Sequence, residues 1–204
     1  MAQIPTRGIS AFKSKLIGGG ARPNLFEVDV TFPTAVNLGV QGDGTGQFDS
    51  ENFRFLCKAA QLPGSNVTPI DVPFRGRSLK VAGDRTIDPW SVTIINDEDF
   101  SHRRAFEAWA QNIAQYGDHS GMTNPADYMG NAVVYQLGRS ESVQQGTNTT
   151  GDNSRILAQY RFIDIFPTNV SPIELSYESG DLLEEFTVDF QVQYYFPEAP
   201  GTGA

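Results

Sequence analysis

An unbroken alternation of apolar and polar side chains near the end of the chain constrains the fold more than any other feature. The alternation lies within residues 182–196. Successive side chains of a β-strand point to opposite faces, so one face of this segment belongs to a core and the other meets polar surroundings. The apolar face carries Phe186, Val188, Phe190, Val192, Tyr194 and Phe196, and the polar face carries Thr187, Asp189, Gln191 and Gln193. The pattern therefore predicts a long strand of an antiparallel sheet.

The composition indicates one mainly β domain. The chain has 204 residues, of which 39% are hydrophobic, and this is enough for one core. Its 20 glycines and 12 prolines separate short runs of β-branched and aromatic residues, which is typical of many strands joined by turns. We predict an antiparallel β-sandwich or partial barrel over residues 21–196, with a flexible leader (residues 1–20) and a flexible tail (residues 197–204).

Further segments have the composition of strands. Residues 67–74 and 77–82 flank Arg75-Gly76 and predict a hairpin, whose second strand is expected to end at Gly83-Asp84. Pro69 and Pro73 have no backbone N–H to donate to a neighbouring strand, so they are expected at the edge of a sheet or at a β-bulge. Residues 167–170 are expected to form the connection that follows the long strand 155–166. The remaining predicted strands cover residues 24–32, 53–61, 90–96, 131–137 and 155–166.

One helix is predicted after the strand 90–96. Asn96 or Asp97 would cap its start, and Gly117 offers a left-handed stop at its end. Apolar residues recur at helical spacing and would anchor the helix on the core through Phe106, Trp109, Ala110 and Ile113. This helix is expected on the outside of the sheet.

The charge balance and the single cysteine exclude several classes of protein. A formal net charge of −9 argues against tight binding of nucleic acid, because lysine and arginine drive binding to phosphates. Cys57 cannot form an intrachain disulfide, and its apolar neighbours favour a buried, inert thiol over a nucleophile. The chain has neither a signal peptide nor an apolar run of about 20 residues. We therefore expect synthesis in a reducing cytoplasm and no membrane anchor.

Residue types that carry catalysis are scarce. His102 and His119 are read as exposed, one on the polar side of the helix and one just after it. The loop 42–51 lacks the alternating ligands of a calcium loop, and Gly18 to Gly20 lack the flanking residues of a phosphate loop. The sequence therefore predicts no catalytic residue, no cofactor and no metal, and hence a protein that is not an enzyme.

Several short stretches lie in order along most of residues 21–196. They are residues 21–26, 57–59 with Leu62-Pro63, 81–86, 96–98, 125–128, 167–170 and 186–188. Together they resemble the tail tube proteins of contractile-tailed, T4-type bacteriophages, and their order makes the resemblance more specific than any single motif. The leader and the loops 39–50 and 140–154 look longer here than in that family.

The resemblance implies a structural virion protein, assembled in the cytoplasm of the infected bacterium. It implies hexameric rings that stack into a tube, through which double-stranded DNA leaves the particle without tight binding. The implied partners are further copies of the chain, the tail sheath protein, and the baseplate and tail terminator proteins. The hairpin and the two long strands are candidates for a β-barrel that lines the lumen, with the acidic side chains Asp71, Asp164 and Asp189 facing it.

Basic residues are candidates for contacts between subunits. Arg7, Lys13 and Lys15 belong to the leader, which would order on stacking, and they would meet acidic groups of the next ring. Arg75 and Arg77 at the hairpin tip are read as exposed turn charges or as partners in salt bridges between subunits, in preference to a phosphate site. Two alternatives share parts of this pattern. One is the tube of a tailocin or a type VI secretion system, and the other is a ligand-binding β-sandwich, which would need exposed aromatic side chains.

Overall fold

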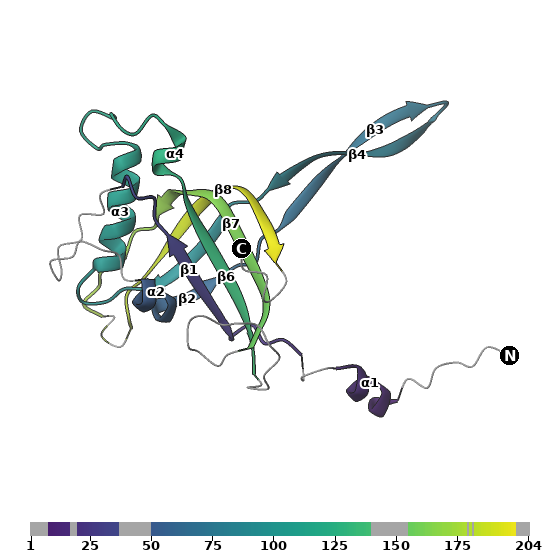
Figure 1. Cartoon of the computed structure of the whole chain (residues 1–204), viewed down its shortest axis with the longest axis horizontal. Helices are drawn as coiled ribbons and strands as arrows, with labels where there is room; N and C mark the ends of the chain where they lie inside the picture. Colours follow the sequence, from purple (N-terminus) through teal and green to yellow (C-terminus); the bar gives the residue numbers. More distant parts are fainter. Residues whose placement is uncertain are drawn as a thin grey trace.

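The main body is a single antiparallel sheet that curls into a nearly closed barrel (Figure 1). The computed structural model describes residues 8–16, 20–36, 50–139, 155–178, 180 and 182–198. This arrangement confirms the predicted mainly β fold in its partial-barrel form. In spatial order the strands are β1 (Phe26–Thr31), β6 (Gly130–Gly138), β7 (Arg155–Val170), β8 (Glu185–Glu198), β5 (Trp90–Ile95) and β2 (Cys57–Ala60).

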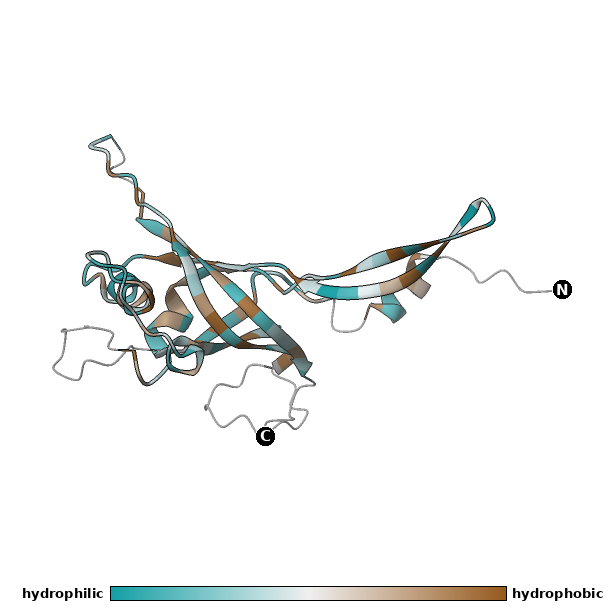
Figure 2. Ribbon diagram, turned by 90° about the horizontal axis from the view of Figure 1, so that it is seen from above, coloured by the Kyte–Doolittle hydropathy of each residue, from teal (hydrophilic) through white to brown (hydrophobic). Residues whose placement is uncertain are grey.

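A separate two-stranded hairpin extends away from the barrel (Figures 1 and 2). It consists of β3 (Ser65–Phe74) and β4 (Arg77–Ile87), joined at Arg75 and Gly76, which both have positive φ. The predicted turn is confirmed, and the ladder is irregular between Val67 and Pro69, as the prolines suggested. The prediction that Gly83-Asp84 ends the second strand is wrong, because β4 continues to Ile87.

Gly83 lies inside β4 for a steric reason. A Cβ atom at this position would lie 2.6 Å from the carbonyl oxygen of Thr68 and 2.9 Å from the Ile70 side chain. The two strands approach each other closely next to the irregular pairing between Val67 and Pro69. Glycine therefore permits a close approach within the hairpin here rather than a stop.

The expectation of a single helix is wrong, because the described residues contain four. The long one is α3 (Ser101–Ile113), and the short ones are α1 (Ile9–Lys15), α2 (Ser50–Leu56) and α4 (Pro125–Tyr128). The predicted strand 53–61 is therefore α2 followed by the short strand β2. Phe53 is fully buried and Phe55 is 79% exposed, so the phenylalanines that resembled one face of a strand lie on different sides of a helical turn. Helix α1 lies within the leader (residues 1–20), whose flexibility stays a prediction.

The termini of α3 also differ from prediction. Phe100 precedes the helix with a φ of 53°, and Asn96 and Asp97 lie before it. Asp97 accepts a hydrogen bond from the Ser101 hydroxyl at 3.2 Å instead of capping the backbone. At the other end Ala114 is extended, so the helix stops before Gly117 is reached.

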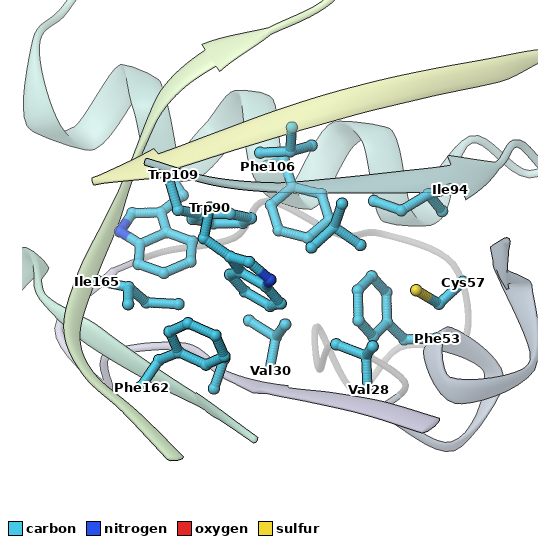
Figure 3. Packing of buried hydrophobic residues seen from close by; sticks show 14 of the residues in the cluster. Val28, Val30, Phe53, Cys57, Trp90, Ile94, Phe106, Trp109, Phe162 and Ile165 are labelled. Carbon is cyan, nitrogen blue, oxygen red and sulfur yellow. The ribbon is translucent and has the colours of Figure 1, made fainter. Parts of the chain in front are cut away.

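Aromatic side chains from the sheet and from α3 fill the barrel (Figure 3). Trp90 stacks on Phe162 with 4.5 Å between ring centroids, and its indole donates to the carbonyl oxygen of Gln61 at 2.8 Å. Trp109 donates to the carbonyl oxygen of Tyr128 at 2.7 Å. Phe106 and Trp109 are fully buried, and Ile113 packs beside them at the edge of the cluster.

The long alternation of β8 changes face part-way along the strand. Val192 pairs with Ile165 and both are buried, whereas Tyr195, not Tyr194, is the next side chain to pack against the core. The change occurs beside Asp164 of β7, whose φ of 54° introduces a local kink as in a bulge. Residues Phe186 to Val192 therefore behave as predicted, but Tyr194 and Phe196 are exposed on the outer surface. Strand β7 also continues through Pro167 to Val170, where a connection was expected.

Substitution of Gly130 should destabilise the barrel. A Cβ atom there would lie 2.6 Å from the carbonyl oxygen of Thr31 and 2.9 Å from the Trp109 ring. We expect Gly130→Ala to reduce the free energy of unfolding by about 1–3 kcal/mol, which is typical of overpacking. Gly117→Ala is the matched control, because among the described residues no atom beyond its chain neighbours lies within 4 Å of its added Cβ. Equal denaturation midpoints for the two variants in urea would contradict the prediction.

Candidate assembly surfaces

The hairpin presents one apolar face that the described part of its own chain leaves exposed. Paired residues of an antiparallel ladder share a face, so the cross-strand pairs place five side chains together. We call them the apolar hairpin face, and their exposed fractions run from 44% to 66%. They are Ile70, Val72, Phe74, Leu79 and Val81. Figure 2 shows the hairpin standing clear of the barrel, so both of its faces are open.

The opposite face of the hairpin is polar and contains Asp71. Its carboxylate lies 3.4 Å from the ammonium of Lys80, its cross-strand partner. Pro69 and Pro73 occupy the same face, as the sequence indicated. Arg75 lies at the tip with its guanidinium 5.4 Å from the centroid of the Phe74 ring, and Arg77 pairs with Phe74 on the apolar side. The two arginines are thus at the exposed tip, where a neighbouring subunit can reach them.

The outer face of the barrel carries carboxylates that are mostly paired. Asp29 pairs with Arg54, Glu185 pairs with Lys58, and Glu198 lies 3.2 Å from Arg161. Asp189 has a different environment. Its carboxylate accepts hydrogen bonds from the Ser91 hydroxyl at 2.5 Å and from the Asn169 amide at 3.0 Å.

Among the three predicted lumen residues, Asp189 and Asp164 belong to the barrel and Asp71 to the hairpin. Asp164 donates its backbone N–H to the Asn131 side chain at 3.3 Å, at the kink in β7. The distribution places acidic groups on two separate parts of the molecule.

The leader contributes a short helix with exposed side chains. Lys13 and Lys15 lie in the last turn of α1, which buries none of its residues. Arg7 lies outside the described residues. The loops 39–49 and 140–154, which look long in the sequence, also lie outside them.

Comparison with known proteins identifies the family. The sequence profile of the family described as phage tail tube protein matches residues 21–198. The chain belongs to the phage tail tube protein family. It is 33% identical over 185 residues to the tail tube protein of Enterobacteria phage T4, covering 91% of this chain and 94% of the relative. It is 24% identical to the tail tube protein of Serratia phage KSP90, covering 85% of this chain and 86% of the relative.

Solved structures with the same fold include a chain of the anti-feeding prophage and a chain of an extracellular contractile injection system. A chain in the baseplate of the anti-feeding prophage has a TM-score of 0.56 at 9% identity, covering 88% of this chain and 96% of that one. A chain in the sheath/tube terminator of an extracellular contractile injection system has a TM-score of 0.57 at 10% identity, covering 88% and 97%. At these identities the likeness concerns the fold alone. The family itself makes this chain a structural component of a phage tail and confirms the prediction that it is not an enzyme.

Few side chains in the described part of the chain are placed to catalyse a reaction or to bind a metal ion. The described ranges contain no cluster of three or more metal-ligating side chains. His102 was predicted to be exposed, and this is wrong, because it lies on the buried side of α3 and its side chain is 1% exposed. It faces Phe53 and lies 3.5 Å from the Asp97 carboxylate. The helical spacing places position 102 on the same side as Phe106 and Trp109. The burial of His102 could therefore have been predicted from the sequence.

The Cys57 thiol is buried, as predicted, and burial raises its pKa to about 12. We therefore expect a thiol-reactive disulfide reagent at pH 8 to label no cysteine in the native protein and one in the denatured protein. The unfolded thiol ionises near pH ~8.5, whereas the folded thiol stays protonated to about 12. Folding stability should thus decrease as the pH rises across this window, and Cys57→Ala should remove that component. Rapid labelling of the native protein would contradict the assignment.

The helices that the structure describes include none that is both long and apolar enough to cross a membrane. This finding agrees with the absence of any long apolar run in the sequence.

Two surfaces were missed by sequence reasoning. The first is the exposure of the apolar hairpin face, since alternation reveals a shared face but not whether that face is covered. The second consists of the apolar side chains of α1 and of the segment before β8, where Leu175, Leu182 and Leu183 are more than two-thirds exposed. The signal available for α1 was its spacing of Ile9, Phe12 and Leu16.

Proposed function

We propose that six copies of this chain close into a ring and that rings stack into the inner tube of a contractile phage tail. The apolar hairpin face is the observation that carries this proposal. A two-stranded hairpin alone is only marginally stable in water, and an exposed contiguous apolar face is typical of a protein interface. A neighbouring subunit that covers this face would stabilise the hairpin and join the subunits at the same time.

Closure into a ring also accounts for the length of the strands. Long strands with exposed edges invite uncontrolled pairing, and a closed assembly removes those edges. We propose that β7, β8 and the hairpin contribute to a barrel that lines the lumen. Arg75 and Arg77 at the hairpin tip would then contact an adjacent subunit.

The lumen is proposed to be acidic and to let double-stranded DNA pass without binding it. The formal charge of −9 supports this, together with Asp71, Asp164 and Asp189 on polar strand faces. Asp71 is partly neutralised by Lys80, so Asp164 and Asp189 would dominate. A structure of the assembled tube tests this directly. Carboxylates buried between subunits, or a lumen of positive potential, would overturn it.

The proposed partners are the tail sheath protein around the tube and the baseplate and tail terminator proteins at its two ends. Support comes from the fold shared with chains in a baseplate and in a sheath/tube terminator. We propose that α3 lies on the side that meets the sheath. Assembly would take place in the cytoplasm of the infected bacterium.

Negative-stain electron microscopy of the concentrated full chain tests the ring proposal. We expect rings or tubes with a central hole. A uniform population of monomers at every concentration examined would overturn the proposal that this chain assembles by itself.

The tube of a related injection system is the second candidate function, because the shared fold includes such machines. The identity to phage T4 over most of both chains favours the phage tail. Capsid and terminase genes next to the gene for this chain would be expected for a phage tube, and their absence would favour the injection system.

A further inference from the structure

The helix α1 carries an apolar stripe that is exposed in the described structure. Ile9, Phe12 and Leu16 recur at i, i+3 and i+7 and are 76%, 65% and 45% exposed. A helix of only seven residues is not stable alone in water, because its few hydrogen bonds do not offset the unfavourable free energy of helix nucleation. The helix therefore needs a surface on which to bury its stripe.

A second exposed apolar surface precedes β8. We call residues 173–178 and 182–184 the acidic leucine segment. Its Leu175, Leu182 and Leu183 are 80%, 76% and 72% exposed. Beside it lies a hollow of about 190 Å³, lined by Phe100, Arg103, Ile173, Leu175 and Glu184. A hollow of this kind, with the exposed Leu175 in its wall, suits one inserted aromatic side chain.

The charges of the two surfaces are complementary. Helix α1 contains Lys13 and Lys15 and no acidic residue. The acidic leucine segment contains Glu174, Glu178 and Glu184, and no lysine or arginine occurs between residues 171 and 185. Opposite charges around an apolar contact favour one partner and one orientation.

Arg103 is the cation that lines the hollow, and its own chain already engages it. Its guanidinium donates to the Glu107 carboxylate at 2.7 Å and to the Ser171 carbonyl oxygen at 3.1 Å. Arg103 therefore does not cancel the negative charge of the segment toward an incoming lysine.

The two surfaces lie on opposite sides of the molecule. In Figure 1, α1 lies near the N-terminus on one side of the barrel, and the yellow-green residues before β8 lie beside the start of α3 on the other. The two surfaces therefore do not meet within one chain. Different patches that meet between identical subunits form a head-to-tail contact, which repeats along a ring or a stack.

We propose that α1 of one subunit docks on the acidic leucine segment of a second copy. Phe12 enters the hollow beside Leu175, and Lys13 and Lys15 face Glu174 and Glu178. This inference rests on the proposed assembly into rings and specifies where the leader binds in it.

Directed cross-linking tests the contact in the full chain. A Phe12→Cys, Leu175→Cys double variant, assembled and treated with a mild oxidant, should give a ladder of disulfide-linked subunits on a non-reducing gel. The native Cys57 is buried, so its thiol should not form a disulfide under these conditions. The control variant pairs Phe12→Cys with Gln111→Cys, on the exposed side of α3, and should give no ladder. Equal ladders from both variants, or assembly without any ladder, would overturn the docking site.

A charge exchange gives an independent readout. We expect Lys13→Glu with Lys15→Glu to raise the concentration needed for half-assembly about tenfold, which corresponds to about 1.4 kcal/mol. Adding Glu174→Lys and Glu178→Lys to the same chain should restore assembly. An unchanged concentration, or no restoration, would overturn the docking while leaving the ring intact. Failure of the unmodified chain to form rings would instead overturn the proposed function.

Discussion

Leu79→Asp is expected to abolish ring and tube formation while leaving the barrel folded. Leu79 lies in the middle of the apolar hairpin face and is 63% exposed in the isolated chain, so the subunit itself loses little. In an assembly the substitution removes a buried leucine, worth about 2 kcal/mol, and places a carboxylate in an apolar interface, which costs several kcal/mol more. The critical concentration for assembly should then rise by at least about a thousandfold.

The neighbouring residue provides a matched control. Ser78 is next to Leu79 in β4 but pairs with Pro73 on the opposite face of the hairpin. Ser78→Asp introduces the same charge one residue away and should shift assembly far less. Sedimentation velocity would give the assembly state of each variant, and far-ultraviolet circular dichroism would confirm folding. Equal effects of the two substitutions would mean that charge on the hairpin, not burial of this face, controls assembly.

The architecture of the barrel was largely predictable because each strand has one buried face. Burial enforces alternation, so the inward residues of β1, β5 and β8 could be recognised from the sequence alone. The predicted faces are wrong where the backbone geometry changes the alternation. At Asp164 a left-handed residue shifts the inward positions, and Tyr194 moves outside although it continues the apolar pattern. Aspartate can adopt this left-handed conformation, and its presence in the sequence does not by itself indicate that it does so.

Short helices and the continuation of strands were predicted less well. Helix α2 is only seven residues long, and its Phe53 and Phe55 have the spacing of a strand. Pro167 was taken as the start of a connection, yet β7 passes through it, because a single proline can lie within a long strand where its missing N–H is not needed in the ladder. Capping by Asn96 or Asp97 failed because the chain turns once more at Phe100 before the helix begins.

The candidate surfaces could be predicted only in part. The sequence identifies which side chains share a face, but exposure depends on what the rest of the chain covers. The hairpin was assigned correctly, while its separation from the barrel emerges only from the three-dimensional structure. The roles of Asp71, Asp164, Asp189 and of the leader lysines depend on subunit arrangement, which one chain does not contain, and they stay predictions.

Trp90→Ala should remove a large part of the stability of the barrel. The side chain is 2% exposed, stacks on Phe162, contacts Phe190, and donates a hydrogen bond to Gln61. Truncation of such an aromatic residue costs about 3–5 kcal/mol, out of a total that is typically about 5–15 kcal/mol. Urea unfolding monitored by circular dichroism, at a protein concentration below that of assembly, would measure the loss without a contribution from mass action.

Two further variants separate packing from hydrogen bonding and from general effects of removing an aromatic ring. Trp90→Phe keeps the ring stack on Phe162 but loses the indole donor, so it should retain more of the stability than Trp90→Ala. Tyr116→Ala removes an aromatic side chain that is 72% exposed, and it should change stability by no more than about 0.5 kcal/mol. If Trp90→Ala were as mild as Tyr116→Ala, the aromatic cluster would not be the principal source of stability, and the rigid barrel that presents the hairpin would need another explanation.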